Sequence, residues 1–494
     1  MYSPGKVLRW LLVLAAICAM IWLGVVAYWQ ETRRAVDEVD VALFIAALPL
    51  AVFAITVGGW YGAAAIRRAR AAQPVATTNA NRDSPALDVH DVEHRFQLAV
   101  HAVAMNTAAG VDTETVLTVL QEKRALAAPS KDIFDAGGFR VAMARVASLD
   151  LAEASDCYRG WLKTQDPARH PDDEQTERLL RCLALLAPPL EEIFNVLPAL
   201  LQPPKAQATA PTLRPSARPA AATWPPPTLR VVVLASDDFG DAARAALKAR
   251  LEPLLASAVA ASRAPVSLLI PPRIGDSAAV QILDRFTVEA NRSGLPDVLL
   301  LIGVDSLADA ASVGRLERMG RLRTATQPRG ETPGEGAFAI LLRATPAQAT
   351  EPVPLARVHR AAQTTRERAV DERGKVSSVA LRDAVASALA DTALEAGTCG
   401  SLVCDGDGLG VRGAEAAETM NACLGRLDAV ADRMDLAAVF GHLGAASFVA
   451  SLGIAATQCR VAQTACVVAG LASPLARYAL VVVPASESAE TPVV

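Results

Sequence analysis

The stretch LPDVLLLIGVDSLADAASVGRLERMGRLRTATQPRGETPGEGAFAILLR, residues 295–343, decides the fold class. Its run DVLLLIGV is continuously apolar, and the earlier runs LRVVVLAS and APVSLLIPP have the same character, with a helical segment between each pair. Apolar runs that alternate with helices are typical of a largely parallel sheet covered on both faces. The sequence therefore predicts an α/β region.

The predicted domain opens with a strand, a glycine turn and a helix. The run FQLAVHAVAM, residues 96–105, reads as a strand, and VDTETVLTVLQEKRAL, residues 111–126, as a helix that Asp112 could cap. Before this opening, residues 73–94 lack apolar periodicity and read as a tether.

A proline-rich segment interrupts the α/β pattern and sets the expected boundaries. Residues 202–228 consist mainly of Pro, Ala and Thr, which is typical of a flexible, partly polyproline-like insert. The expected divisions are a membrane hairpin at 1–72, a first part of the domain at 95–201, the rest of its N-terminal half at 229–343, a C-terminal half at 344–486 and a tail at 487–494.

The N-terminal region predicts two transmembrane helices. Residues 10–29 and 41–66 carry no charge, and each segment is long enough to span a hydrocarbon core of about 30 Å. Aromatic residues near the ends of these segments are expected at the membrane interfaces, namely Trp10, Trp29, Trp60 and Tyr61. A cleaved signal peptide is the alternative for the first segment, but its apolar run is long for one and no Ala-x-Ala-like site follows.

Basic residues beside these segments predict the orientation. Lys6 and Arg9 precede the first segment, and Arg67, Arg68 and Arg70 follow the second. Positive charge favours the cytoplasmic side, so both chain ends are expected in the cytoplasm, with the intervening loop in the periplasm of a bacterial inner-membrane protein.

Two later apolar stretches, residues 436–457 and 461–484, allow two interpretations. Small residues and a histidine interrupt the first, and the second ends in the strand-like run YALVVVP. We favour buried core for both, with a second membrane hairpin as the alternative.

Composition excludes several classes of function. The net charge is only −4, which gives no indication of nucleic-acid binding. The eight cysteines form no CxxC pair and the six histidines show no HExxH spacing, so the sequence predicts neither disulfides nor a metal site, and no cofactor.

Several segments resemble β-ketoacyl synthases of the thiolase-like superfamily. Residues 295–343 are similar to the part of those enzymes that follows the catalytic cysteine, with a G-V-D/E turn, a GRL segment and a G-E-G-A turn. FGHLGAASFVAS, residues 440–451, looks like the family's G-H-x-G-A-A-S-G turn, and YALVVVP like its last core strand. The resemblance covers residues 95–486 and implies a duplicated, five-layered α-β-α-β-α fold, which usually forms homodimers.

The resemblance implies that the catalytic set is incomplete. The family's nucleophile is a cysteine at the N-terminus of a buried helix, but residues 202–397 contain no cysteine. Cys182 reads as an apolar packing residue, and Cys157 lies too early in the chain. His442 matches one family histidine, whereas the stretch expected to hold the other reads GSLVCDGDGLGVRGAEAAE. A lone histidine at such a turn more often fixes backbone geometry than transfers protons.

Other chemical motifs are weak. CDGDGLG, residues 404–410, lacks the alternating ligands of a calcium loop and reads as a turn. Ser306 has no G-x-S-x-G elbow. Glu335 reads as a solvated or capping carboxylate in a structural turn, with a general base as the alternative. The candidate pocket or structural-turn residues are Asp305, Gly334, Glu335, Gly336, Gly441, His442 and Gly444.

Four arginines follow one another at helical spacing. They are interpreted as a solvated face, with an acidic partner surface as the alternative, and they are Arg315, Arg318, Arg321 and Arg323.

Three functional hypotheses follow. The first is a membrane-anchored, noncatalytic synthase-like protein that acts as an interaction or assembly component of a bacterial envelope machine such as type VI secretion. The second is a membrane-associated acyltransferase or condensing enzyme of lipid metabolism, in which Cys157, Cys182 or Cys404 carries the acyl group. The third is a module that binds an acyl chain or acyl carrier protein without turnover.

Overall fold

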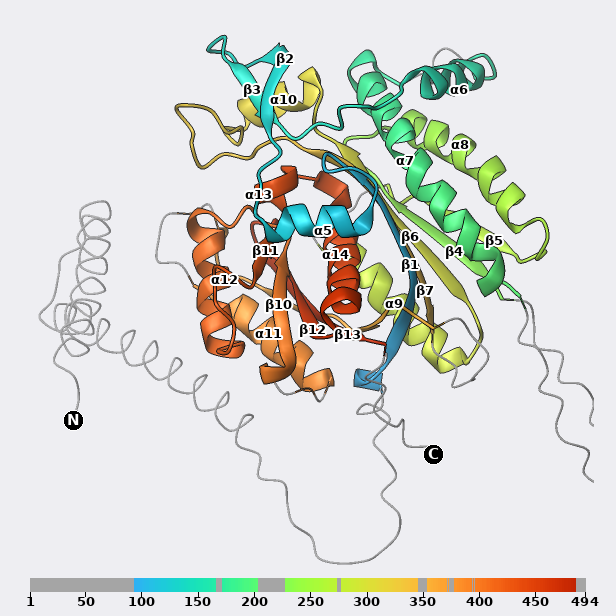
Figure 1. Ribbon diagram of the computed structural model, residues 1–494. Helices are drawn as coiled ribbons and strands as arrows, with labels where there is room; N and C mark the ends of the chain where they lie inside the picture. The colour runs from blue at the N-terminus through green and yellow to red at the C-terminus, as the bar shows by residue number, and fades with distance from the viewer. Residues whose placement is uncertain are drawn as a thin grey trace, which may run out of the picture. The chain divides into compact units, whose positions relative to one another are not determined.

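The fold was examined in a computed structural model (Figure 1). Contacts divide the chain into Met1–Ala86 and Leu87–Val494. The predicted spans at 10–29 and 41–66, most of the tether and most of the proline-rich insert lie outside the described residues. The structure describes residues 93–165, 171–202, 227–272, 277–344, 353–370, 372, 377–392, 394 and 396–485.

The N-terminal half is built on five strands in the order β5-β4-β6-β7-β1. Strands β5, β4 and β6 run parallel, and β7 is antiparallel to both β6 and β1. The strands are β1 (Gln97–Thr107), β4 (Leu229–Leu234), β5 (Val266–Leu269), β6 (Val298–Ser306) and β7 (Glu335–Ala344). The helices and a small hairpin are α5 (Thr113–Gln121), β2 (Ala128–Phe134), β3 (Arg140–Met143), α6 (Ala152–Leu162), α7 (Asp173–Leu200), α8 (Asp241–Val259), α9 (Ala278–Ser293) and α10 (Ala310–Arg318).

The C-terminal half repeats this connectivity in the order β11-β10-β12-β13-β8, with β9 also on β13. Again three strands are parallel, and the last, β13, runs antiparallel to its neighbours. The strands are β8 (Ala356–His359), β9 (Ala362–Thr365), β10 (Cys399–Cys404), β11 (Arg433–Asp435), β12 (Ala465–Gly470) and β13 (Ala476–Pro484). The helices are α11 (Val379–Thr392), α12 (Gly410–Cys423), α13 (Leu436–Phe440) and α14 (Ser447–Ala462), with short 3-10 turns at Ala396–Thr398 and Gly444–Ala446.

The two halves join through antiparallel pairing of β1 with β8, where Gln97 lies opposite His359. Three apolar clusters then define the layers. Side chains of α5, α9 and α14 pack between the two halves, those of α6, α7 and α8 cover the outer face of the first half, and those of α11 and α12 cover the second. Figure 1 shows this α-β-α-β-α arrangement. The hydrogen bonds of β1 and β8 make one eleven-stranded sheet of the two β layers.

The prediction of a largely parallel sheet is wrong, because β1, β7, β8, β9 and β13 pair antiparallel and make the sheet mixed. Two further predictions differ from the structure in detail. Asp112 caps α5 and accepts a hydrogen bond of 2.8 Å from the Thr115 amide, but the helix ends earlier than predicted because Lys123 has a positive φ of 54°. Strand β5 is not covered on both faces, since it forms an edge of the sheet and leaves Val266 and Leu269 exposed.

The interpretation of residues 436–484 as core is confirmed. Helix α14 is buried from Ser447 to Cys459 and lies in the central cluster, and β12 and β13 are core strands. Among the described residues, two helices are long and apolar enough to cross a membrane, Gln175–Leu200 and Gly444–Ala462. In the second, 78% of the most apolar window is buried inside the fold, which is the behaviour of a core helix.

Candidate functional site

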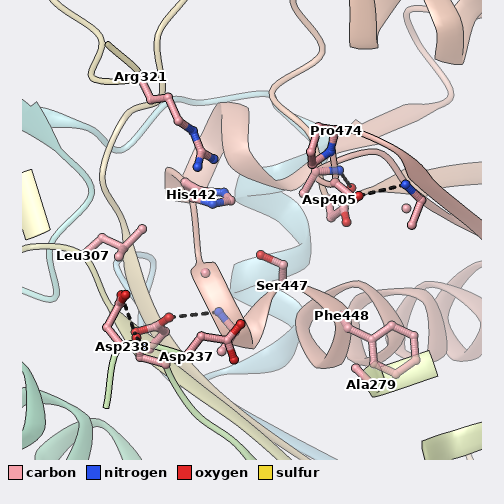
Figure 2. A pocket seen from close by; sticks show the side chains of 18 of the residues that line it. Asp237, Asp238, Ala279, Leu307, Arg321, Asp405, His442, Ser447, Phe448 and Pro474 are labelled. Carbon is pink, nitrogen blue, oxygen red and sulfur yellow. Dashed lines mark hydrogen bonds between the residues drawn. The ribbon is translucent and has the colours of Figure 1, made fainter. Parts of the chain in front are cut away.

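A cavity of about 440 Å³ lies where the two halves meet. Figure 2 shows Asp237, Asp238 and Leu307 on one side of it and Asp405 and Pro474 on the other. The N-terminal half contributes, among others, Arg178, Asp238, Val280, Asp305, Leu307 and Arg315. The C-terminal half contributes, among others, Asp405, His442, Gly444, Ser447, Phe448 and Tyr478.

Asp305, at the end of β6, ties the two halves together. Its Oδ1 accepts hydrogen bonds of 3.0 and 2.7 Å from Nε and Nη2 of Arg178, which is buried on α7. Its Oδ2 accepts a bond of 2.9 Å from the Ala445 amide, in the turn that leads into α14. A carboxylate at a helix N-terminus is favoured by the unpaired amides and the helix dipole, so Asp305 fixes the position of α14.

Gly444 is required for this arrangement. A Cβ at this position would lie 2.1 Å from Asp305 Oδ2, and the residue has a φ of +51°. Only glycine lets the turn approach the carboxylate so closely.

His442 lines the cavity but makes only a loose contact with an acid. Its Nε2 lies 3.7 Å from Oε2 of Glu331, while Oε1 of Glu331 accepts a hydrogen bond of 2.6 Å from Nη2 of Arg321. Burial raises the pKa of Glu331, but the electrostatic influence of His442 and Arg321 outweighs burial and leaves that pKa below its usual value. Glu331 is therefore held as a carboxylate beside the histidine.

Asp405 directly follows β10 and has a different environment. Its Oδ1 accepts hydrogen bonds of 2.6 and 2.9 Å from the amides of Leu471 and Ala472, and the Tyr478 hydroxyl lies 3.4 Å from Oδ2. Burial raises the pKa of Asp405 despite these bonds and the opposing electrostatic influence of Arg477 and His442. Burial also raises the pKa of Tyr478 well above its usual value.

The structure divides the predicted site residues into two groups. Asp305, His442 and Gly444 line the cavity, whereas Gly334, Glu335, Gly336 and Gly441 lie behind it. There the turn at Gly334 packs on the turn at Gly441, with a hydrogen bond of 3.2 Å from the Gly334 amide to the His442 carbonyl. A Cβ on Gly334 would lie 2.0 Å from the Phe440 carbonyl oxygen, so the two glycine turns form one structural contact.

The prediction that Glu335 is solvated or capping is wrong. Glu335 is fully buried and accepts hydrogen bonds of 2.7 and 2.5 Å from Arg181, together with bonds from the Val146 amide and the Ser306 hydroxyl. A buried carboxylate with this many partners holds α7 against β7 and has no free lone pair directed at the cavity.

The four arginines predicted to form a solvated face divide in the structure, because Arg318 and Arg321 are exposed whereas Arg315 and Arg323 are partly buried. Arg315 pairs with Asp238 at 2.6 Å, Arg321 with Glu331, and Arg323 with Asp407 at 3.0 Å. Three of the four arginines therefore pair with carboxylates of this chain.

The candidate cysteines have unequal environments. Cys182 and Cys404 are fully buried, and burial raises the pKa of each thiol well above its usual value. Cys157 is half-buried and lies outside the central cavity. The buried helix that precedes β6 is α9, whose first turn contributes Ala279 and Val280 to the cavity wall.

The turn interpretation of CDGDGLG is confirmed. Gly408 and Gly410 have positive φ values of 68° and 56°, and Asp405 and Asp407 are directed to separate partners. Within the described ranges, no group of three His, Cys, Asp or Glu side chains is arranged to hold a metal ion.

Sequence reasoning missed most of the cavity wall, including the polar residues Arg178, Asp238, Asp405 and Tyr478. Arg181 lies within the apolar run of α7, and this was an available signal for a buried ion pair, whereas Arg178 follows Thr176 and Glu177 in the polar start of the helix. Asp238 and Tyr478 carried no comparable signal.

Comparisons with known proteins place the fold. No family model matches the sequence, and no curated protein matches it. The chain is similar to the solved ishigamide ketosynthase/chain length factor, with 15% identity over 78% of this chain and 99% of that one and a TM-score of 0.50. It is also similar to a β-ketoacyl synthase from Burkholderia phymatum STM815, with 11% identity over 79% of this chain and 99% of that one and a TM-score of 0.50.

A third similar structure is the oxazolomycin ketosynthase domain OzmH KS7 of Streptomyces albus JA3453, with 15% identity over 81% of this chain and 76% of that one and a TM-score of 0.51. These likenesses extend over most of the chain at low identity. They establish the ketosynthase-like, thiolase-like fold that the sequence resemblance implied.

Proposed function

We propose that this chain is a membrane-anchored, noncatalytic ketosynthase-like protein that serves as an interaction or assembly component of a bacterial envelope machine such as type VI secretion. One observation carries the proposal. Helix α9 enters the central cavity with Ala279 and Val280, at the place where the resemblance expects a cysteine nucleophile, and residues 202–397 contain no cysteine. Carbon–carbon bond formation through a thioester requires that nucleophile.

The remaining polar groups support the same proposal. His442 lies beside Glu331 and Arg321, and the stretch expected to supply a second imidazole supplies Asp405 instead. Asp305 is occupied by Arg178 and the Ala445 amide. These contacts occupy the polar groups and stabilise the junction of the two halves, which supports a noncatalytic role.

Membrane anchoring rests on the sequence of the N-terminal region. The uncharged segments 10–29 and 41–66 and the flanking basic residues favour a hairpin with both chain ends in the cytoplasm of the inner membrane. Resistance of the full chain to extraction from membranes by carbonate, and its release when residues 1–72 are removed, would support this part of the proposal. Release of the full chain would contradict it.

The cavity favours a second candidate function. Its volume of about 440 Å³ is within the range of about 300–1,000 Å³ in which proteins hold small ligands. The chain could bind an acyl chain in this cavity, or dock an acyl carrier protein, without turnover.

Acyl loading tests the proposal directly. The purified full chain is incubated with acyl-CoA and acyl-carrier thioesters, and covalent adducts are detected by intact mass, with a Cys157→Ser variant as a matched control. Absence of any adduct is the expected result. A saturable adduct on one cysteine would overturn the noncatalytic proposal and favour an acyltransferase or condensing enzyme. Reversible binding without an adduct would select the second candidate.

A further inference from the structure

A second, mainly apolar site lies in the outer layer of the N-terminal half. Figure 1 shows α6, α7 and α8 lying together there. Cavities of about 330 Å³ and 240 Å³ adjoin in this layer and share Cys157, Leu183 and Arg250. We refer to the two together as the α6–α8 groove. The groove is separate from the cavity between the two halves.

The larger cavity suits an alkyl chain. Its walls are Tyr158 and Trp161 of α6, whose rings stack with centroids 5.9 Å apart, and Ala246, Pro253 and Leu254 of α8. Apart from the tyrosine hydroxyl and the indole N–H of Trp161, the polar groups on this wall are those of Cys157 and Arg250, which also line the smaller cavity. Removing an alkyl chain from water along such a wall is favourable.

Arg250 supplies the position for a head group. It is the basic residue that lines both cavities, its Nη1 lies 3.2 Å from Cys157 Sγ, and its Nη2 donates a hydrogen bond of 2.5 Å to Glu153 Oε1. The Glu153 side chain is 69% exposed, so water can solvate it when another carboxylate replaces it on the guanidinium. Asp150 lies in the same region, but its Oδ1 already accepts a bond from the Ala152 amide.

We propose that the α6–α8 groove binds a single-chain fatty acid, with its carboxylate on Arg250 and its alkyl chain along Tyr158, Trp161 and Leu254. Arginine binds carboxylates through paired hydrogen bonds, and the apolar wall begins directly beside the guanidinium. Binding therefore tightens with chain length, by about fourfold for each CH₂ that becomes buried.

Cys157 reports occupancy of the groove. The full chain, reconstituted in nanodiscs, is treated with a small alkylating reagent with and without laurate, and the alkylation rate of each cysteine is measured by peptide mass spectrometry. Laurate at about ten times its Kd slows alkylation of Cys157 by about tenfold. Cys423, the other half-buried cysteine of the described residues, lies outside the groove and is the internal control.

Substitutions test separately how the carboxylate and the alkyl chain contribute to binding. Arg250→Gln abolishes the protection of Cys157 by laurate. Glu153→Gln strengthens that protection because the competing carboxylate is lost. Ala249→Phe fills the groove and therefore also abolishes the protection. Each rate is compared with the ligand-free rate of the same variant, and circular dichroism confirms that the variant is folded. Equal protection by laurate and dodecanol, stronger protection by dodecylamine, or equal slowing of Cys423 would overturn the proposal.

Discussion

Two buried aspartates face the same cavity from opposite halves of the molecule. Asp305 ends β6 and Asp405 follows β10, and each accepts hydrogen bonds from backbone amides of the C-terminal half. They differ in their side-chain partners. Asp305 accepts a hydrogen bond of 2.7 Å from Nη2 of the Arg178 guanidinium, whereas the side-chain partner of Asp405 is the neutral hydroxyl of Tyr478, 3.4 Å from its Oδ2. Both aspartates therefore accept hydrogen bonds from backbone amides, but Asp305 is paired with a cation and Asp405, among the described residues, is not directly paired with one.

The two aspartates are expected to contribute differently to the stability of the fold. Removing one member of a buried ion pair leaves an uncompensated charge, whereas removing a carboxylate that burial already disfavours can leave the protein no less stable. The ion pair between Asp305 and Arg178 is thus needed to hold the two halves together. Asp405, on the C-terminal wall of the cavity, can be substituted without loss of the fold.

The largest expected effect comes from Asp305→Asn. The substitution preserves shape but leaves the buried Arg178 with only the half-exposed Asp238 as a partner. We expect a loss of about 3 kcal/mol in the free energy of unfolding, measured by denaturant titration. A loss below about 1 kcal/mol, the value typical of a surface pair, would contradict the role of Asp305 as a joint.

Gly444→Ala tests the same joint from the other side. The added Cβ meets Asp305 Oδ2 and occupies a positive-φ position, so the turn must shift away from the carboxylate. We expect a loss of about 1–3 kcal/mol in the free energy of unfolding. Gly410→Ala is a matched control for the backbone effect, because Gly410 has a φ of +56° with no heavy atom within 4 Å of the added Cβ.

Asp405→Asn should behave in the opposite way to Asp305→Asn. The amide can accept the bonds from Leu471 and Ala472 without a buried charge, so at neutral pH we expect a change within about 1 kcal/mol, in the stabilising direction. A loss as large as that of Asp305→Asn would show that the two aspartates are equivalent and remove the contrast between the walls.

The stability of Asp405→Asn relative to wild type should also depend on pH. The folded pKa of Asp405 is raised above its usual value of 3.8, so the folded wild type binds a proton that the unfolded chain has released. Its stability contribution is therefore greatest below the unfolded pKa and falls as the pH rises through the folded pKa. The stability difference between Asp405→Asn and wild type should grow in favour of the variant over that window, as measured by unfolding at a series of pH values.

Tyr478→Phe has the smallest expected effect. The hydroxyl lies 3.4 Å from Asp405, at the long end of hydrogen-bond distances, and its loss should cost less than about 1 kcal/mol. A thermal melt checks this value. A larger loss would show that the tyrosine compensates Asp405 as Arg178 compensates Asp305.

The sequence predicted local elements well because their signals are local. The apolar runs became β4 and β6, and the Asp112 cap lies where a short-range pattern places it. The glycine turns at 334 and 441 were expected from the resemblance. Strand β5 was predicted to be covered on both faces but lies at the edge of the sheet. An apolar run does not reveal whether a strand has a neighbouring strand on each side.

Most of the cavity wall was not predictable because its contacts join distant parts of the chain. Arg178 and Asp305 are 127 residues apart in sequence, and the partner of Glu335, Arg181, is 154 residues away. A carboxylate in a glycine-rich turn is usually solvated, so Glu335 could be assigned correctly only when the approach of α7 was known. His442 and Gly444 were identified by resemblance, and their contacts with Glu331 and Asp305 came from the structure.

The central position of β1 has a consequence for synthesis on the ribosome. This first strand is hydrogen-bonded to β7 and β8, so its partners emerge only after more than two hundred further residues have been made. Strand β13, at the other end of the chain, is the shared neighbour of β8, β9 and β12. A nascent chain therefore carries unpaired apolar strands until translation is nearly complete, and a product that ends before β13 is a substrate for chaperones and proteases.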